Sequence, residues 1–370
     1  MVVRLLTFEE RRALVRRCAE RAVDLRVVTA EDIFDVLHAI DSGSYGVVFE
    51  CARRLCGTRY AMKIATKTAK ADHLGVECAM YGRVGAAIGI PQCVFLGTNR
   101  AANRVLVMTL LGKPLDHLSL PFSLKTVCIV AEQLIDRLEL IHSRGILHRD
   151  IKPGNLLLGA DKAKHIIHLI DFGLSIPISH SRATGSLVGT FEFMSDAALR
   201  GAPQSRRDDI ESAAYTLIDL ARPGGLPWPA RTAADALRAR ASARSQLCVG
   251  LPSEFSALVN YAHRLSFRER PNYGLIRFMF QNLLRKMHAS DDMRTEWISP
   301  SESRHLDEPF LNFSRQDHPS VLSAVDNILI SHDYPRISPN PFRRFIIRII
   351  RVFRRRSSST VPKKRTVIPI

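Results

Sequence analysis

Polar residues that suit metal-assisted group transfer gather in "ILHRDIKPGNLLL" (146–158). They are His148, Arg149, Asp150, Lys152 and Asn155. Another carboxylate follows at Asp171, in "DFG". Carboxylate and amide oxygens are ligands that Mg²⁺ prefers, and a carboxylate can orient a hydroxyl group and accept its proton. These residue types fit phosphoryl transfer, which needs cations and alignment more than covalent chemistry.

Two further residues upstream complete a recognisable order. Lys63 lies in "AMKI", and Glu77 lies in a helical stretch after it. With the two clusters above, they resemble the protein kinase signature. Such a site would use ATP and Mg²⁺, and each residue then has an expected role. Lys63 would hold the α- and β-phosphates, Glu77 would fix Lys63, Asn155 and Asp171 would ligate Mg²⁺, Asp150 would act as base, and Lys152 would neutralise the γ-phosphate.

A glycine-punctuated stretch, "IDSGSYGVVF" (40–49), precedes the lysine. In a GxGxxGxV phosphate-covering loop, Gly43, Gly46 and Val48 occupy the expected places, and Ile40 lies just before the loop. Asp41 replaces the first glycine. An acid beside a polyanion costs Coulomb energy, but solvent screens that position. We expect a reduced ATP affinity, and the alternative is a pseudokinase.

The elements around these residues change type along the chain. Strands and turns are predicted over 34–65, a helix over 70–86, and strands over 92–96 and 104–110. A long helix is predicted from the N-cap Ser123 to the stop at Gly145, then a buried strand before Asp171, and mostly helices after 205. The sequence therefore predicts an α+β fold, with a small β-rich lobe, a larger helical lobe and a cleft between them.

Longer segments show a more specific resemblance, from about Ile33 to Trp297. Its motifs are "VLVMTLLGKPLDHL", "GTFEFMS", "SRRDDIESAAYTLIDL" and "GGLPW", with "MSDAA" where Ala-Pro-Glu is usual. They resemble the casein kinase 1 superfamily, which includes the vaccinia-related kinases. The resemblance implies a serine/threonine protein kinase with a bilobal kinase fold.

The resemblance also implies roles for single residues. Met108 would be the gatekeeper, and 109–111, ending at Leu111, would be the hinge that meets adenine. Asp209 would anchor the catalytic loop. Thr190 would contact Asp150 and Lys152, a pairing that points to Ser or Thr acceptors. The residues expected to sandwich the adenine ring are Val48, Ala61 and Leu157.

One position departs from many casein kinase 1 members. Glu192 lies two residues after Thr190, where those members carry an arginine that binds a primed phosphate. A carboxylate repels a phosphorylated or acidic substrate site. We therefore expect only a weak preference for acidic or primed substrates.

The chain divides into four predicted regions. They are an N-terminal helical extension at 1–32, a kinase domain at 33–298 with lobes at about 33–110 and 111–298, a linker at 299–341, and a basic amphipathic tail at 342–370. Within the extension, a helix over 7–26 is expected to act as a scaffold on the small lobe rather than as a targeting element.

Composition limits the classes of protein to which the chain can belong. The chain of 370 residues carries a net charge of +17, of which the tail contributes +10 from ten Lys or Arg and no acid. The seven scattered cysteines favour neither a zinc site nor a disulfide framework, and fit a reducing compartment. No apolar run is long enough to cross a bilayer, and the N-terminus lacks a signal-peptide pattern. We expect an intracellular protein in the cytoplasm, the nucleus or both; its oligomeric state is not predicted.

The tail reads as a basic amphipathic helix. Phe342, Phe345, Ile346 and Ile349 share one helical face, and arginines share the other. Three uses stay open: an anionic membrane surface, nuclear import or nucleic-acid contact, and packing back on the kinase domain. A low-activity or pseudokinase scaffold, tethered to membranes or nucleic acid by this tail, is the alternative to an active enzyme.

Overall fold

The computed structural model describes most of the central part of the chain. The described residues are 28–43, 46–65, 72–183, 187–228, 232–288 and 295–298. The predicted helix at 7–26, the linker at 299–341 and the tail at 342–370 lie outside these residues. Among the described residues, no helix is both long and apolar enough to span a bilayer.

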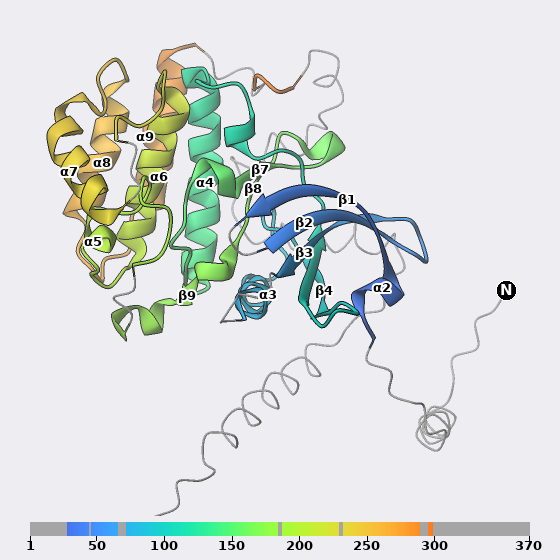
Figure 1. The fold of residues 1–370 in the computed structure, drawn as a ribbon. Coiled ribbons are helices and arrows are strands. Elements are labelled where there is room, and N and C mark those ends of the chain that lie inside the picture. Colours follow the sequence, from blue (N-terminus) through green and yellow to red (C-terminus); the bar gives the residue numbers. More distant parts are fainter. Residues whose placement is uncertain are drawn as a thin grey trace, which may run out of the picture. The chain divides into compact units, whose positions relative to one another are not determined.

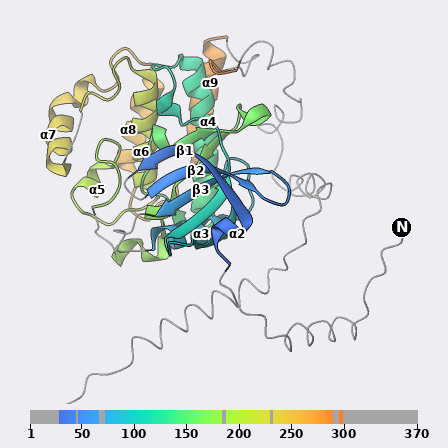
Figure 2. The ribbon, with the colours of Figure 1, turned by 45° about the vertical axis from the view of Figure 1, so that its right-hand side comes forward.

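A five-stranded antiparallel sheet forms the first lobe (Figure 1). Its strands are β1 (Phe34–Gly43), β2 (Gly46–Arg53), β3 (Arg59–Ala65), β4 (Cys93–Thr98) and β5 (Arg104–Thr109), in the spatial order β1-β2-β3-β5-β4. The neighbouring strands β1, β2 and β3 lie side by side in Figure 2. A short helix, α2 (Ala30–Ile33), precedes the sheet, and α3 (His73–Val84) contacts β4 and β5.

The sheet has a core on each face, because successive side chains of a strand point to opposite sides. On β5, Val105 and Val107 join a small apolar cluster with Phe34 and Met62. The residues between and after them, Leu106 and Met108, join the main core with the helical lobe. The same alternation places Lys63 of β3 on the face opposite Met62.

The second lobe is mainly helical (Figure 1). Its helices are α4 (Leu124–Ser143), α5 (Asp196–Leu199), α6 (Arg206–Ala221), α7 (Ala233–Ala243), α8 (Ser253–Arg264) and α9 (Tyr273–Lys286). Two small antiparallel pairs join β6 (Ile146–Leu147) to β9 (Ile176–Pro177) and β7 (Leu156–Leu158) to β8 (Ile167–Leu169). Short 3₁₀ turns include η2 (Pro153–Asn155) and η4 (Phe172–Leu174).

The long helix α4 begins and ends where its sequence signals lie. The Ser123 side chain accepts the Thr126 N–H, which satisfies an otherwise free donor of the first turn. Gly145 follows the helix with a φ of 71°, a conformation that glycine adopts without steric cost. The predicted N-cap and stop are therefore confirmed, as is the α+β architecture with a β-rich and a helical lobe.

Candidate active site

The register of the sheet places the predicted nucleotide residues on one face. Val48 pairs with Lys63 across β2 and β3, and Ala61 pairs with Met108 across β3 and β5. Directly paired residues, and residues two apart on one strand, point to the same side. Val48, Ala61, Lys63 and Met108 therefore share the face that looks toward the helical lobe's core.

The remaining nucleotide residues lie at the edges of this face. Leu157 belongs to β7 and bridges to Pro114, and Leu111 is half-buried just beyond β5. Ile40 lies where the register of β1 against β2 shifts, so the ladder does not assign its side chain to the face. The structure thus groups most of the predicted adenine contacts, and leaves Ile40 outside the grouping.

Gly43 and Gly46 lie opposite each other at the two ends of the glycine loop. Gly43 ends β1 and pairs with Gly46, which begins β2. Gly46 has a φ of 156°, and a Cβ atom there would collide with the backbone carbonyl oxygen of Ile64. Glycine is required at this position by close backbone approach to β3. Asp41, the departure from the loop pattern, is exposed, and its Oδ1 accepts the Ser42 N–H at 2.7 Å.

Lys63 is held between two carboxylates. Its Nζ lies 2.9 Å from Glu77 Oε2 and 3.3 Å from Asp171 Oδ1. Burial lowers the pKa of Lys63, but the two carboxylates outweigh that effect and the net direction is upward. The predicted contact between Lys63 and Glu77 is therefore present, and the lysine is charged.

The two carboxylates respond differently because they share one lysine. Burial raises the pKa of Glu77 to about 7. The charge of Lys63 acts to lower this pKa, but the negative charge of Asp171 acts to raise it further, so Lys63 offsets the rise only in part. Burial also acts to raise the pKa of Asp171, but Lys63 and the Gly173 N–H bring it below its ordinary value. Asp171 is thus the carboxylate that is firmly anionic near neutral pH.

Tyr81 links these groups and was not predicted from the sequence. Its buried hydroxyl donates to Glu77 Oε1 at 3.3 Å and accepts the Asp171 N–H at 3.2 Å. Its ring packs on Phe172 with the centroids 4.9 Å apart. Tyr81 lies four residues after Glu77, and this helical spacing is the signal that could have identified it.

The catalytic-loop residues form one hydrogen-bonded cluster. Asp150 Oδ1 accepts from the Thr190 N–H and from Thr190 Oγ1, both at 2.9 Å. Lys152 Nζ donates to Thr190 Oγ1 at 2.8 Å and lies 3.0 Å from Asp150 Oδ2. Asn155 Nδ2 donates to Asp150 Oδ2 at 3.0 Å and to the Asp150 carbonyl at 2.7 Å. Four predicted residues that are up to 40 positions apart therefore meet here.

A buried carboxylate of α6 supports this loop from below. Asp209 accepts the N–H groups of His148 and Arg149, each at 2.9 Å, and His142 Nε2 lies 2.8 Å from it. Burial acts to raise the pKa of Asp209, but these hydrogen bonds and nearby histidines bring it below its ordinary value. His142 was not predicted; its Nδ1 lies 2.7 Å from the Tyr273 hydroxyl, so the network assigns the proton to Nε2.

The segment after Thr190 is fixed by α7. Arg240, almost fully buried, donates to the carbonyl oxygens of Phe191 at 3.2 Å and Glu192 at 2.8 Å. Its guanidinium lies over the rings of Tyr215 and Trp228, at 4.5 and 5.1 Å from their centroids. Sequence reasoning missed Arg240. The same helix also contains Arg238, and nothing in the sequence marks one of the two arginines as buried.

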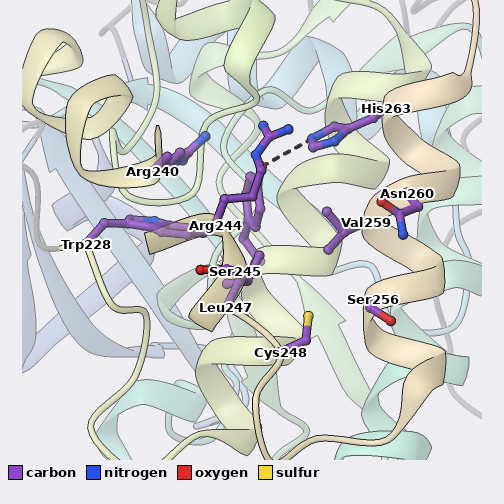
Figure 3. A pocket seen from close by; sticks show the side chains of 11 residues that line it. Trp228, Arg240, Arg244, Ser245, Leu247, Cys248, Ser256, Val259, Asn260 and His263 are labelled. Carbon is purple, nitrogen blue, oxygen red and sulfur yellow. Dashed lines mark hydrogen bonds between the residues drawn. The ribbon is translucent and has the colours of Figure 1, made fainter. Parts of the chain in front are cut away.

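A pocket of about 220 Å³ lies beside Arg240 (Figure 3). Trp228, Arg244, Leu247 and His263 are among its lining residues, which come from the α6–α7 and α7–α8 regions and from α8. All its lining residues belong to the helical lobe, and none of them is on the Lys63 face. It is therefore not the nucleotide site.

Three groups near this pocket have the spacing of metal ligands. Within the described ranges, Asp196, Glu211 and His263 bring one ligand atom each within 4.8 Å of one another. Arg240 and Arg244 already pair with Asp196, at 3.1 and 2.8 Å. Because two guanidinium groups neutralise this corner, the cluster is a hydrogen-bonded anchor rather than a cation site.

The comparison with protein families agrees with this geometry. A family model described as "Protein kinase domain" matches residues 34–293. The match contains both lobes and every residue of the cluster around Asp150 and Lys63.

Proposed function

The chain belongs to the protein kinase domain family, and we propose that within it the protein is a serine/threonine kinase of the casein kinase 1 type. A protein kinase transfers the γ-phosphate of ATP to protein substrates.

The residues of the cluster have complementary roles in the proposed transfer. Asp150 would orient the acceptor hydroxyl and take its proton, and its carboxylate is held by Thr190 and Asn155. Lys152 would neutralise charge on the moving phosphoryl group, and Lys63 would bind the other phosphates. Each group is already positioned by its neighbours, so little reorganisation is needed at the moment of transfer.

The donor set fits Mg²⁺ as the cofactor. The anionic carboxylate of Asp171 and the amide oxygen of Asn155 are hard ligands. The two side-chain hydrogen bonds of Asn155 both use its amide nitrogen, so its side-chain oxygen is the group available to a cation. When bound, the ion held by Asp171 and Asn155 would offset the negative charge of the phosphates.

The contact between Lys152 and Thr190 is the observation that carries the choice of acceptor. In kinases that this chain resembles, this pairing accompanies Ser and Thr acceptors. Lys152 Nζ lies 2.8 Å from Thr190 Oγ1, and both contact Asp150. The pair supports an aliphatic hydroxyl as the group that approaches Asp150.

Phosphoamino-acid analysis tests this proposal. The purified chain is given radiolabelled ATP, Mg²⁺ and casein or histone, beside an Asp150→Asn variant. We expect label on serine or threonine, and at least a hundredfold loss in the variant, on the order of a general-base contribution. Label on tyrosine alone would refute the acceptor class, and equal labelling by the variant would show that the activity belongs to a contaminant.

The charge of the basic tail at 342–370 is the basis for the proposed partner. Ten Lys or Arg without an acid in 342–370 favour an anionic membrane surface, where each cation adds about 1 kcal/mol near the headgroups. Nuclear or nucleic-acid contact is the other proposed use, and both place the protein inside the cell. Co-sedimentation with phosphatidylserine vesicles, using the chain with and without 342–370, distinguishes these two uses of the tail. Equal sedimentation of both chains would exclude membrane binding by the tail.

A scaffold of low activity is the second candidate, and the acid at Asp41 favours it. The same labelling assay decides, since a scaffold would show no transfer that depends on Asp150. The contacts of Lys63 with both Glu77 and Asp171 support the active enzyme.

A further inference from the structure

Two thiols meet next to the catalytic ion pair. Cys78 follows Glu77 on α3, and Cys93 is the first residue of β4. Their Sγ atoms lie 2.9 Å apart, about 0.9 Å more than a covalent S–S bond of roughly 2.0 Å. Both residues are partly exposed, so a small oxidant can reach them.

The two sulfur atoms are not equivalent. The hydrogen bond with Cys93 lowers the pKa of the Cys78 thiol, whereas the same bond and burial raise the pKa of Cys93. Arg104 also favours the Cys78 thiolate, and the carboxylates of Glu77 and Asp72 oppose it. Since the thiolate is the reactive form, Cys78 is the nucleophile of the pair and Cys93 the resolving thiol.

We propose that Cys78 and Cys93 are a reversible redox modification site, at which a hydroperoxide converts the two thiols to a disulfide that joins α3 to β4. The Cys78 thiolate attacks the peroxide oxygen, the O–O bond breaks, and an alcohol or water leaves after protonation. Cys93 then attacks the resulting sulfenic acid, the S–S bond forms, and water leaves. Two electrons pass from the thiols to the peroxide, and a small dithiol reverses the change.

The bond would act on the position of Glu77. β4 pairs with β5, which pairs with β3, so Cys93 belongs to the same sheet as Lys63. The thiols are adjacent in the arrangement in which Lys63 and Glu77 lie 2.9 Å apart. Oxidation would therefore hold α3 where the ion pair is formed. The inference does not rest on the proposed acceptor class or subfamily.

Peptide mapping of the full chain tests the site. The protein is treated with hydrogen peroxide, alkylated and digested with trypsin without reduction. Trypsin cleaves after Arg83, so the two cysteines leave on separate peptides unless they are bonded. We expect a linked pair with the mass of two hydrogens lost, which dithiothreitol separates. Failure to find it, under conditions that oxidise the exposed Cys56, would overturn the proposal.

Variants and hydrogen exchange test its consequence. Cys78→Ser and Cys93→Ser are each expected to abolish the linked pair, and Cys56→Ser, at an exposed thiol in the turn after β2, to retain it. In the wild type, oxidation should slow amide exchange in α3 and raise the thermal midpoint by several degrees, with no such change in Cys93→Ser. Unchanged exchange in α3 of the linked protein would contradict the proposed hold on the helix.

Discussion

Asp196, the first residue of α5, forms an ion pair with Arg240 of α7. Asp196 Oδ1 lies 3.1 Å from Arg240 Nη1. Asp196 lies in "MSDAA" (194–198). Arg240 also holds the carbonyl groups of Phe191 and Glu192. One buried guanidinium therefore fixes both the backbone at 191–192 and the carboxylate of Asp196.

Replacing Arg240 by alanine should destabilise the protein. The change removes three hydrogen bonds and leaves Asp196 with Arg244 as its remaining cation. Removing one partner of a buried ion pair costs roughly 3–5 kcal/mol, and we expect about 2–4 kcal/mol in urea unfolding because Arg244 compensates in part. Protein-substrate KM should rise as the segment at 191–192 loosens.

Arg238→Ala is the matched control on the same helix. Arg238 pairs with Asp235 at 2.6 Å, but its side chain is 75 % exposed, and exposed pairs contribute about 0–1 kcal/mol. Equal losses for the two variants would mean that the helix, and not the Arg240 contacts, sets the stability.

Glu77 should give the folded protein a distinct dependence on pH. Its pKa is about 7, above the ordinary 4.5, so between these values the unfolded chain ionises while the folded chain stays protonated. The stability contributed by this difference is complete below pH 4.5 and is lost as pH rises through 7. The loss amounts to about 3 kcal/mol.

The measurement is the difference in unfolding free energy between the wild type and Glu77→Gln across pH 4.5–7.5. The difference is needed because burial lowers the pKa of His168 to about 4, and this acts in the opposite direction over part of the range in both proteins. We expect the wild type to lose stability relative to the variant as pH rises. A constant difference would show that Glu77 titrates normally.

The sequence predicted the parts of the site that lie close together along the chain. Glycine spacing located the loop at Gly43 and Gly46, and helical spacing with the N-cap Ser123 located α4. Both depend on local rules of backbone geometry, which a single sequence carries.

Beyond the pairings that the family resemblance implied, such as Lys63 with Glu77 and Thr190 with Asp150, the sequence did not predict contacts formed by tertiary packing. Arg240 meets Asp196 only because α7 packs on the segment after Thr190. His142 of α4 meets Asp209 of α6, and Tyr273 of α9 in turn meets His142. In each case the side chain is of a type usually found in solvent or in an ordinary core, so its burial had no signature in composition or periodicity.

Asp41 is expected to weaken ATP binding. It is exposed and lies on β1 opposite Val48, near the face that holds Lys63. An exposed charge is worth up to about 1 kcal/mol, so Asp41→Asn should lower KM for ATP by roughly two- to fivefold at low salt, with kcat little changed.

Salt provides the control for this effect. Because exposed charges are screened within about 10 Å at 0.1 M salt, the gain should shrink as salt rises. A gain in ATP affinity that is independent of salt would point to loop flexibility rather than charge. In that case Asp41→Gly should lower the KM for ATP more than Asp41→Asn does.

Tyr81→Phe should impair the site without removing a charged group. The change takes a donor from Glu77 and leaves the Asp171 N–H without its acceptor. An unsatisfied buried donor costs roughly 1–3 kcal/mol, so we expect a comparable loss of unfolding free energy and a lower kcat. Tyr261→Phe is the control, since its hydroxyl likewise accepts a backbone N–H, from Asn272 at 2.7 Å, but this hydrogen bond is solvent-exposed and Tyr261 of α8 is only half-buried.

Reversing the charge at Glu192 should change which substrates are preferred. The Glu192 backbone is fixed by Trp228 and Arg240, so a new side chain there would project from the same point. In Glu192→Arg, a guanidinium would face substrate in place of a carboxylate, and charge-assisted hydrogen bonds to phosphate are strong. We expect kcat/KM to rise about tenfold, or about 1.4 kcal/mol, for peptides phosphorylated upstream of the acceptor.

Peptide arrays with and without upstream phosphoserine measure this change directly. The unphosphorylated peptides are the internal control, because their kcat/KM should stay within a factor of about two if the variant only adds a phosphate contact. Glu192→Gln separates the two charge effects: it removes the repulsion of the carboxylate but adds no cation, and should give an intermediate gain. A wild-type enzyme that already strongly prefers primed peptides would show that Glu192 does not face the substrate.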